Sequence, residues 1–140
     1  MIDLPLPEPM VWIGSASILI ALLALIPRRR RDPQRWFNYA QRAGARSRAR
    51  WQCEYTARWR LLARCPERAQ ETDHFTPWAR GGATNDRNAV AACRRHNQAK
   101  GGRLPTRWTR NLITWRRRSY WPAGVHRKPG ARYRPYSQRQ

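Results

Sequence analysis

The feature that most limits what this chain can fold into is a small set of thiols and one imidazole. The members of this set are Cys53, Cys65, Cys93 and His96. A chain of 140 residues has room for one small domain and tails, and such domains often need a bound metal for stability. Three cysteines cannot pair off completely as disulfides, whereas three thiolates and an imidazole make a complete tetrahedral ligand set for zinc. The sequence therefore predicts a structural zinc site.

The spacing of these residues supports the zinc site unequally. Cys93 and His96 stand at the predicted start of a helix, where a Cys-x-x-His step places both side chains on one face. Eleven residues separate Cys53 from Cys65, whereas paired zinc cysteines are usually separated by about two to four. Ordinary buried thiols with a surface histidine are therefore the alternative.

The charge of the chain is strongly positive. It has 29 basic and 8 acidic residues, and 27 of the basic residues are arginine. Two of the acidic residues and none of the basic ones precede position 28, so residues 28–140 carry a formal charge of +23, from 29 basic and 6 acidic side chains. Such a charge favours nucleic acid or anionic lipid headgroups as partners. A GC-rich genome would also raise the arginine content, so charge alone does not establish nucleic-acid binding.

An apolar run near the N-terminus predicts a membrane anchor. Residues 10–26 are an uncharged and mostly apolar stretch of 17 residues, near the lower limit for crossing a hydrocarbon core of about 30 Å. Arginines at 28–31 follow it directly. By the positive-inside rule we expect a transmembrane helix over residues 10–27, with residues 1–9 outside the cell and the remainder in the cytoplasm. A cleaved signal peptide is the alternative, but its positive charge would precede the apolar run.

Residues 28–50 are predicted to be a basic juxtamembrane linker that contains a helix. Asp32 and Pro33 are typical of a helix start, and residues 34–42 contain no helix breaker. The apolar residues that would share one face of this helix are Trp36, Phe37 and Ala40. The segment would lie on the inner leaflet as an amphipathic helix, or serve as a plain linker. A serine and arginine run up to position 50 predicts the boundary of the folded domain.

Four residues downstream of Cys65 suggest a reaction on a phosphodiester. Asp73 and His74 are adjacent at the end of a short predicted strand, so their side chains point to opposite sides. Asn97 offers a neutral oxygen ligand, and Lys100 follows one helical turn later, within reach of a phosphate. Phosphodiester hydrolysis needs a base for the attacking water and a divalent metal for the developing charge. Oxygen ligands of this kind favour Mg²⁺ or Mn²⁺.

The order of these residues follows the pattern of a known family. The matching pieces are Asp73-His74, Pro77, Gly81-Gly82, Asn88-Ala89-Val90 and Cys93-Arg94-Arg95-His96-Asn97-Gln98-Ala99-Lys100-Gly101. In order and spacing this stretch resembles the HNH endonuclease family, in which a ββα-metal finger ends in a helix that opens with Cys-x-x-Cys-Asn-x-x-Lys-Gly. The resemblance covers roughly residues 50–102 and says nothing about either terminus.

The resemblance implies a role for each matching residue. His74 would be the general base that activates water, and Asp73 and Asn97 would hold the catalytic metal ion. Asn88 belongs to the catalytic motif as a support that pins the loop and orients the base. His96 stands where the family has its fourth zinc cysteine, which makes the site a Cys-x-x-His variant. Because some members use a histidine as the helix ligand of the catalytic metal, His96 could instead serve that ion.

The secondary structure expected for this segment is short. We expect a strand that ends near His74, a loop over residues 76–87, a second strand over about 88–91, and a helix from near Arg94 to Gly101. The basic residues predicted to contact nucleic acid are Arg94, Arg95, Lys100 and Arg103.

Residues 103–140 are predicted to be a basic and aromatic extension, with eleven basic and no acidic side chains. Trp108, Leu112 and Trp115 stand at helical spacing and would pack on the domain, and the chain from Pro122 onward is predicted to be disordered. The extension would clamp nucleic acid through arginines and stacking rings, or remain a solvated basic tail.

These observations predict an α+β fold, with a small ββα-metal (HNH) domain over residues 51–102, one N-terminal transmembrane helix and a basic C-terminal tail. The predicted function is a membrane-anchored HNH endonuclease that nicks or cleaves double-stranded DNA at the cytoplasmic face of the cell membrane. Its catalytic ion would be Mg²⁺ or Mn²⁺, and Zn²⁺ would be structural. The alternatives are a catalytically inactive zinc-stapled nucleic-acid-binding module and a structural membrane-surface protein, which would leave the motif unexplained.

Overall fold

The computed structural model describes residues 18, 21, 30–57 and 59–135. In these parts of the chain no helix is long and apolar enough to cross a membrane. The transmembrane helix predicted over residues 10–27 lies outside the described residues, apart from Ile18 and Ala21, and so does the predicted outer segment 1–9. The membrane anchor therefore stays a prediction.

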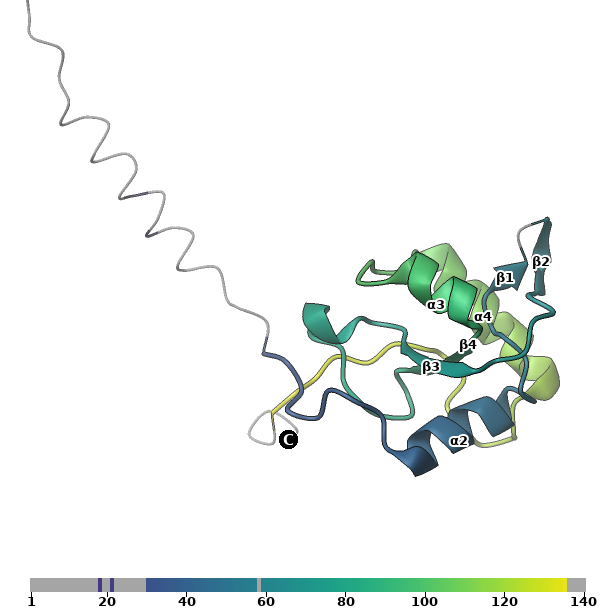
Figure 1. The fold of residues 1–140 in the computed structure, drawn as a ribbon, viewed down its shortest axis with the longest axis horizontal. Coiled ribbons are helices and arrows are strands. Elements are labelled where there is room, and N and C mark those ends of the chain that lie inside the picture. Colours follow the sequence, from purple (N-terminus) through teal and green to yellow (C-terminus); the bar gives the residue numbers. More distant parts are fainter. Residues whose placement is uncertain (1–17, 19–20, 22–29, 58, 136–140) are drawn as a thin grey trace, which may run out of the picture.

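The described chain is a small α+β fold with short antiparallel strands (Figure 1). Its elements are, in order, α2 (Tyr39–Arg48), β1 (Thr56–Ala57), β2 (Arg60–Arg64), β3 (Glu71–His74), the 3₁₀ helix η1 (Trp78–Arg80), β4 (Ala89–Ala92), α3 (Arg94–Lys100) and α4 (Arg107–Tyr120). β1 pairs with β2 and β3 pairs with β4, so the strands form two separate two-stranded sheets.

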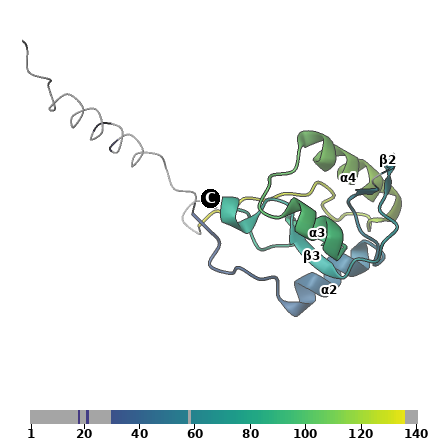
Figure 2. The same cartoon turned by 45° about the horizontal axis from the view of Figure 1, so that its top comes forward.

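Strands β3 and β4 and helix α3 form the predicted ββα unit. The register places Asp73 opposite Val90 and His74 opposite Ala89. All four residues of β4 are buried, which fits the small apolar sequence Ala-Val-Ala-Ala. Helix α3 lies beside β3 (Figure 2) and ends at Gly101, whose φ of 51° suits a glycine. The strand, loop and helix predicted from the sequence are confirmed to within a residue or two.

The hairpin β1–β2 accounts for the long spacing between Cys53 and Cys65. Its two strands turn the chain back on itself, and the backbone N–H of Cys65 donates to the Tyr55 carbonyl over 2.8 Å. The two cysteines, both fully buried, therefore meet at the base of the hairpin. The hairpin therefore takes up the eleven residues between the two cysteines without separating these predicted zinc ligands.

Helix α2 begins later than predicted and is part of the domain. Asn38 is its N-cap, in a capping box with Gln41, while the carboxylate of Asp32 accepts the backbone N–H of Gln34 without starting a helix. Trp36 is 71% exposed and Phe37 is 5% exposed, so the two do not share one face. The predicted helix over residues 34–42 and its shared apolar face were therefore wrong.

The predicted domain boundary near residue 50 also needs correction. Ala45, in the middle of α2, is fully buried, and α2 packs against β3 and β4. The apolar contacts of this short helix lie within the domain, so residues 38–50 are part of the folded unit.

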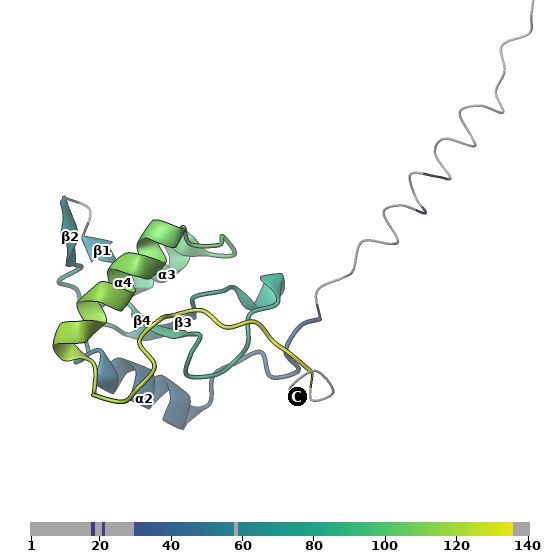
Figure 3. The same ribbon diagram turned by 180° about the vertical axis from the view of Figure 1, so that it is seen from behind.

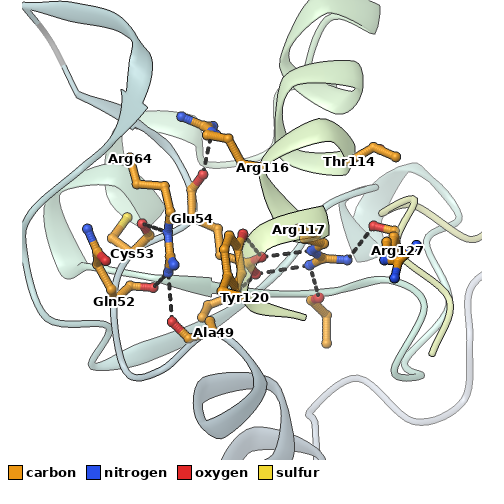
Figure 4. Close-up of polar contacts among 12 residues, drawn as sticks. Ala49, Gln52, Cys53, Glu54, Arg64, Thr114, Arg116, Arg117, Tyr120 and Arg127 are labelled. Carbon is orange, nitrogen blue, oxygen red and sulfur yellow. Dashed lines mark hydrogen bonds and ion pairs between the residues drawn. The ribbon is translucent and has the colours of Figure 1, made fainter. Parts of the chain in front are cut away.

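Helix α4 packs through a different face from the one predicted. Leu112 and Ile113 are buried, but Trp108 is 63% and Trp115 is 53% exposed. The buried face also carries Arg117, whose guanidinium binds both oxygens of the fully buried Glu54 (Figure 4). The buried face of α4 thus includes an ion pair, which hydropathy patterns do not show.

The chain beyond Pro122 is ordered as far as residue 135, so the prediction of disorder from Pro122 onward was wrong for that part. It runs back across the domain (Figure 3) and pairs with the loop that follows η1. Ala83 N–H donates to the Ala131 carbonyl over 3.0 Å, and Tyr133 N–H donates to the Gly81 carbonyl over 2.9 Å. Backbone hydrogen bonds hold this segment in place. Because such bonds leave no signal in the amino-acid composition, the polar composition wrongly suggested disorder.

Candidate functional site

The four predicted zinc ligands meet in one cluster. The sulfurs of Cys53, Cys65 and Cys93 and a ring nitrogen of His96 all lie within 4.8 Å of one another. His96 Nδ1 is 3.2 Å from Cys93 Sγ and 3.6 Å from Cys53 Sγ. A tetrahedral site with Zn–S bonds of about 2.3 Å has edges of roughly 3.8 Å, so the cluster fits one zinc ion. His96 therefore belongs with the three cysteines.

The electrostatics of the cluster also favour a cation. Burial raises the pKa of the Cys53 thiol to about 12; backbone hydrogen bonds oppose this shift, and the sulfurs of Cys93 and Cys65 add to it. Burial, together with the charge of Arg95, lowers the pKa of His96, so its ring is a neutral ligand at pH 7. Three thiolates can coexist in this space with a divalent cation among them, and zinc supplies that charge.

A second group of predicted residues lines a pocket of about 400 Å³ bordered by β3, α3 and the segments of residues 35–37 and 77–79. Asp73, His74, Asn97 and Lys100 all belong to its wall. Strand β3 supplies the first two residues and α3 supplies the others. The structure thus brings together the residues that the sequence analysis assigned to the base, the metal ligands and a phosphate contact.

Asp73 is a buried carboxylate with two donors. Tyr55 OH donates to its Oδ2 over 2.6 Å, and Lys100 Nζ donates to its Oδ1 over 3.0 Å. Burial raises the pKa of Asp73, while Lys100 and the Tyr55 hydrogen bond oppose the shift. Lys100 also donates to the His74 carbonyl over 2.8 Å. The ammonium therefore lies within the site, where it compensates the carboxylate.

His74 is held as a neutral ring with a defined tautomer. The Thr84 hydroxyl donates its one hydrogen to the Gln34 carbonyl, so it must accept from His74 Nε2, which lies 3.0 Å from Thr84 Oγ1. The Nδ1 atom is then the proton acceptor of the ring. Burial, aided by the Lys100 charge, lowers the pKa of His74 to about 4. Phe37 stacks on the ring with centroids 4.1 Å apart, which fixes the ring plane.

Asn97 presents an oxygen as its remaining ligand atom. Its Nδ2 donates to Glu71 Oε2 over 2.5 Å, which orients the amide and leaves Oδ1 as the acceptor. The Asp73 carboxylate and the Asn97 carbonyl are hard oxygen donors, as Mg²⁺ and Mn²⁺ prefer. The residues present therefore fit a divalent ion in this pocket.

Asn88 is a fully buried residue that holds the loop beside the site. Its Nδ2 donates to the carbonyls of Thr76 and Ala83 over 2.9 and 2.8 Å, and its Oδ1 accepts from Thr76 N–H over 2.8 Å. It is not among the residues that line the 400 Å³ pocket. The geometry is that of a positioning residue, in keeping with the supporting role that the resemblance implies.

The basic residues predicted to contact nucleic acid have other partners in the structure. Arg94 pairs with Glu71 over 3.3 Å, and a guanidinium nitrogen of Arg95 lies 4.0 Å from Cys65 Sγ. Arg103 donates to the carbonyls of Ala99 and Lys100 at the end of α3. Arg94, Arg95 and Arg103 are exposed and remain available to a ligand, whereas Lys100 is turned inward.

Glu71, which orients Asn97, and three further residues that contact the site were not found by sequence reasoning. Tyr55 joins the two metal regions, because its hydroxyl binds Asp73 while its ring stacks on His96 at 5.8 Å. Thr84 and Phe37 hold the base, yet both lie at least ten residues from His74 in sequence. Phe37 gave an apolar signal that was assigned to the membrane, and Thr84 gave none beyond its place after Gly81-Gly82.

The comparisons with known proteins agree with this geometry. The model of the HNH endonuclease family matches residues 52–103, which span β1 to α3 and hold both the zinc cluster and the pocket residues of β3 and α3. No curated protein and no solved structure matches the chain.

Proposed function

We propose that residues 52–103, which the HNH endonuclease model matches, form the catalytic domain of a metal-dependent endonuclease that hydrolyses DNA phosphodiester bonds. The single observation that carries the proposal is the state of His74. A neutral imidazole, with its Nε2 hydrogen directed at Thr84 and Nδ1 left to accept a proton, shares a pocket with Asp73 and Asn97. This is the arrangement that a general base for water requires.

In the proposed reaction His74 Nδ1 takes a proton from a water molecule. The water oxygen forms a bond to phosphorus as the bond from phosphorus to the leaving sugar oxygen breaks, and that oxygen leaves with its electron pair and is then protonated by solvent. A divalent ion, when bound, supplies positive charge for the phosphate and for the leaving oxygen. Thr84 keeps the proton of the neutral ring on Nε2, and Phe37 keeps the ring plane fixed.

Asp73 and Asn97 are the residues that would hold the ion. Asp73 Oδ1 is the oxygen bound by Lys100, so we expect the ammonium to move aside or to share the carboxylate when the ion binds. Glu71 holds the Asn97 amide in a fixed orientation and thereby directs its oxygen. A lysine released from Asp73 would then be able to reach the scissile phosphate, as its position one helical turn after Asn97 predicts.

A binding module without catalysis is the second candidate, and the Asp73–Lys100 ion pair favours it. Both side chains are at least nine-tenths buried, and the lysine already neutralises the carboxylate that would hold the ion. If this pair did not open, the same zinc-stapled fold would hold nucleic acid without cutting it.

Cleavage of supercoiled plasmid DNA by the full chain tests the proposal. We expect nicked or linear products with at least one of Mg²⁺, Mn²⁺, Ni²⁺ or Zn²⁺, and none in their absence. Asn97→Ala should raise the ion concentration needed for half-maximal cleavage, whereas Asn111→Ala, at an exposed asparagine on α4 outside this pocket, should not. DNA binding without cleavage under all four ions would support the binding module instead.

We further propose that residues 10–27 anchor the domain to the cell membrane with residues 28–140 in the cytoplasm. The support for this is the apolar run and the arginines that follow it. The full chain should sediment with membranes after an alkaline carbonate wash, and a variant lacking residues 1–29 should not. Release of the full chain by the wash would contradict the anchor.

A further inference from the structure

The larger of the two hollows has none of Asp73, His74, Asn97 and Lys100 in its wall. Its volume is about 1090 Å³, and it is bounded by the loop of residues 83–87, the start of α4 and the segment of residues 126–134. We propose that this hollow, called here the basic groove, binds one strand of nucleic acid through its phosphates. The inference rests on the proposed function in its choice of ligand, but binding of a strand requires no cleavage.

The charge of the basic groove is positive and largely uncompensated. The cationic side chains in its wall are Arg87, Arg107, Arg110, Lys128, Arg132 and Arg134. Within the described residues none of them forms a salt bridge, in contrast to Arg48, Arg94 and Arg117. Asp32 is the one carboxylate in the wall, and its two oxygens accept the backbone N–H groups of Gln34 and Thr84, each over 2.9 Å. A polyanion would supply the missing negative charge.

The first turn of α4 carries positive charge, which the dipole of the helix disfavours at this end. Arg107 and Arg110 lie in its first turn, where the helix dipole favours acidic side chains, and no acidic residue is present there. The Nε of Arg110 is buried without a hydrogen-bond partner. Thr106 caps the helix, so the first turn is formed in spite of this repulsion. Phosphate groups in the basic groove would turn the repulsion into attraction.

The size and position of the basic groove favour a polymer. Its volume of about 1090 Å³ lies just above the range for a small-molecule site, about 300 to 1000 Å³, and its wall carries six cationic side chains where such sites are mostly apolar. Tyr133 offers a ring on which a base can stack. Thr84 lines the basic groove and also binds His74, so a strand lying there passes next to the proposed base.

The segment that closes the basic groove depends on one glycine. Gly130 has a φ of 106°, and a Cβ at this position would lie 3.1 Å from the ring of Phe75. Its backbone N–H donates to the Arg87 carbonyl over 2.9 Å. Close approach at Gly130 therefore brings residues 126–134 against the loop that carries Arg87, and both segments form part of the groove wall.

Binding of a fluorescent single-stranded oligonucleotide of about 15 nucleotides, followed by anisotropy, tests the inference. The protein is the full chain with His74→Ala, in non-ionic detergent and without added divalent ion, so that cleavage plays no part. The groove variant adds Arg87→Gln, Arg107→Gln and Arg134→Gln, which are exposed residues whose side chains make no hydrogen bond within the described structure. The control variant adds Arg50→Gln, Arg68→Gln and Arg118→Gln, which removes the same charge from exposed positions outside the groove wall.

We expect the groove variant to bind about tenfold more weakly or worse near 0.1 M salt, with affinity retained in the control. Three lost phosphate contacts should also flatten the slope of log K against log salt by about 2. Equal losses in both variants would mean that only net charge matters and would overturn the inference, as would an unchanged groove variant. The inference would also fail if the groove variant lost affinity for phosphatidylglycerol in mixed micelles with the detergent but kept its affinity for the oligonucleotide. Because the assay needs no catalysis, its result is independent of whether plasmid DNA is cleaved.

Discussion

Two regions of the domain both contain a buried acid with a cationic partner, and they differ in how completely the acid is satisfied. The structural region consists of Cys53, Glu54, Cys65, Cys93, His96, Arg117 and Tyr120. The reactive region consists of Asp73, His74, Asn97 and Lys100. Glu54 accepts hydrogen bonds from Arg117 Nε and Nη2, from Tyr120 OH and from Ala91 N–H, at 2.7 to 3.0 Å. Asp73 accepts two, from Tyr55 and Lys100.

The difference teaches which carboxylate can exchange its partner. Glu54 has two donors on each oxygen and lines neither hollow described above, so removing any one donor leaves a buried charge short of a partner. Asp73 lies in the wall of a pocket and keeps lone pairs free on both oxygens. A buried carboxylate whose hydrogen-bonding capacity is fully used stabilises the fold. A carboxylate that borders a pocket and keeps free lone pairs is able to bind an ion.

The largest effect should come from removing zinc from the structural region. The binding free energy of a structural zinc site is about 10 kcal/mol or more and is coupled to folding, so a chelator or Cys93→Ser should abolish the cooperative unfolding transition. Metal analysis of the purified chain should find one zinc per molecule, and circular dichroism should show loss of structure on chelation and recovery on adding zinc. A chain that stays folded after zinc has been removed would show that the structural region does not depend on the metal.

The second largest effect should come from removing the cationic partner of Glu54. Arg117→Met leaves Glu54 buried without its cation, and we expect a loss of about 3 to 5 kcal/mol in the free energy of unfolding. The neighbouring Arg118 is exposed on the same helix, and Arg118→Met should cost less than about 0.5 kcal/mol. Urea unfolding at equilibrium measures both values. Similar losses in the two variants would show that Glu54 does not depend on its partner.

Lys100→Met makes the corresponding change in the reactive region. Asp73 keeps the Tyr55 hydrogen bond and borders the pocket, so we expect a smaller loss, about 1 to 2 kcal/mol. Added Mn²⁺ should restore stability to this variant more than it stabilises the wild type, because the ion would take the place of the ammonium. It should not restore Arg117→Met. If Lys100→Met lost as much free energy of unfolding as Arg117→Met and did not respond to Mn²⁺, Asp73 would stabilise the fold as Glu54 does and would not bind an ion.

The smallest effect is the contribution of His74 to the dependence of stability on pH. Burial lowers the pKa of His74 to about 4 in the folded state, below the ordinary value of 6.5. Between these values the unfolded chain binds a proton that the folded chain does not, so this contribution to stability falls as pH decreases from 6.5 towards 4. For a half-buried ring we expect about 1 kcal/mol between pH 7 and pH 5.

Urea unfolding of the wild type and of His74→Gln at the two pH values isolates this contribution, because the titration of the zinc ligands is common to both proteins. The stability of the variant should fall less on acidification. Equal falls in the two proteins would show that the folded-state pKa of His74 is close to its ordinary value.

The parts of the domain that were predictable from sequence depend on short spacings. Cys93 and His96 are three residues apart, so the start of one helix is enough to bring them together. Asp73 and His74 are adjacent on a strand that pairs with the next one, and Asn97 follows on the next helix. Local rules for strands, turns and helices therefore place these residues near one another.

The parts that could not be predicted depend on partners far apart in the chain. Glu54 and Arg117 are 63 residues apart, and no local sequence pattern predicts that this arginine is buried. Thr84 binds the carbonyl of Gln34, 50 residues away, and so connects the N-terminal segment to the base. The polar segment after Pro122 is held in place by backbone hydrogen bonds, so no hydropathy pattern in the sequence predicts its position. Such contacts are determined by packing of the whole domain.

The most direct test of the reactive region is the single-turnover rate of DNA cleavage by His74→Ala, with Tyr39→Ala as the matched control, since Tyr39 is an exposed ring that lines neither hollow. We predict a rate about 10² to 10⁴ times lower for His74→Ala, with DNA affinity retained, and an unchanged rate for Tyr39→Ala, because a general base contributes about that factor. Cleavage by His74→Ala at the wild-type rate would contradict the assignment of the base and, with it, the division of the domain into a structural and a reactive region.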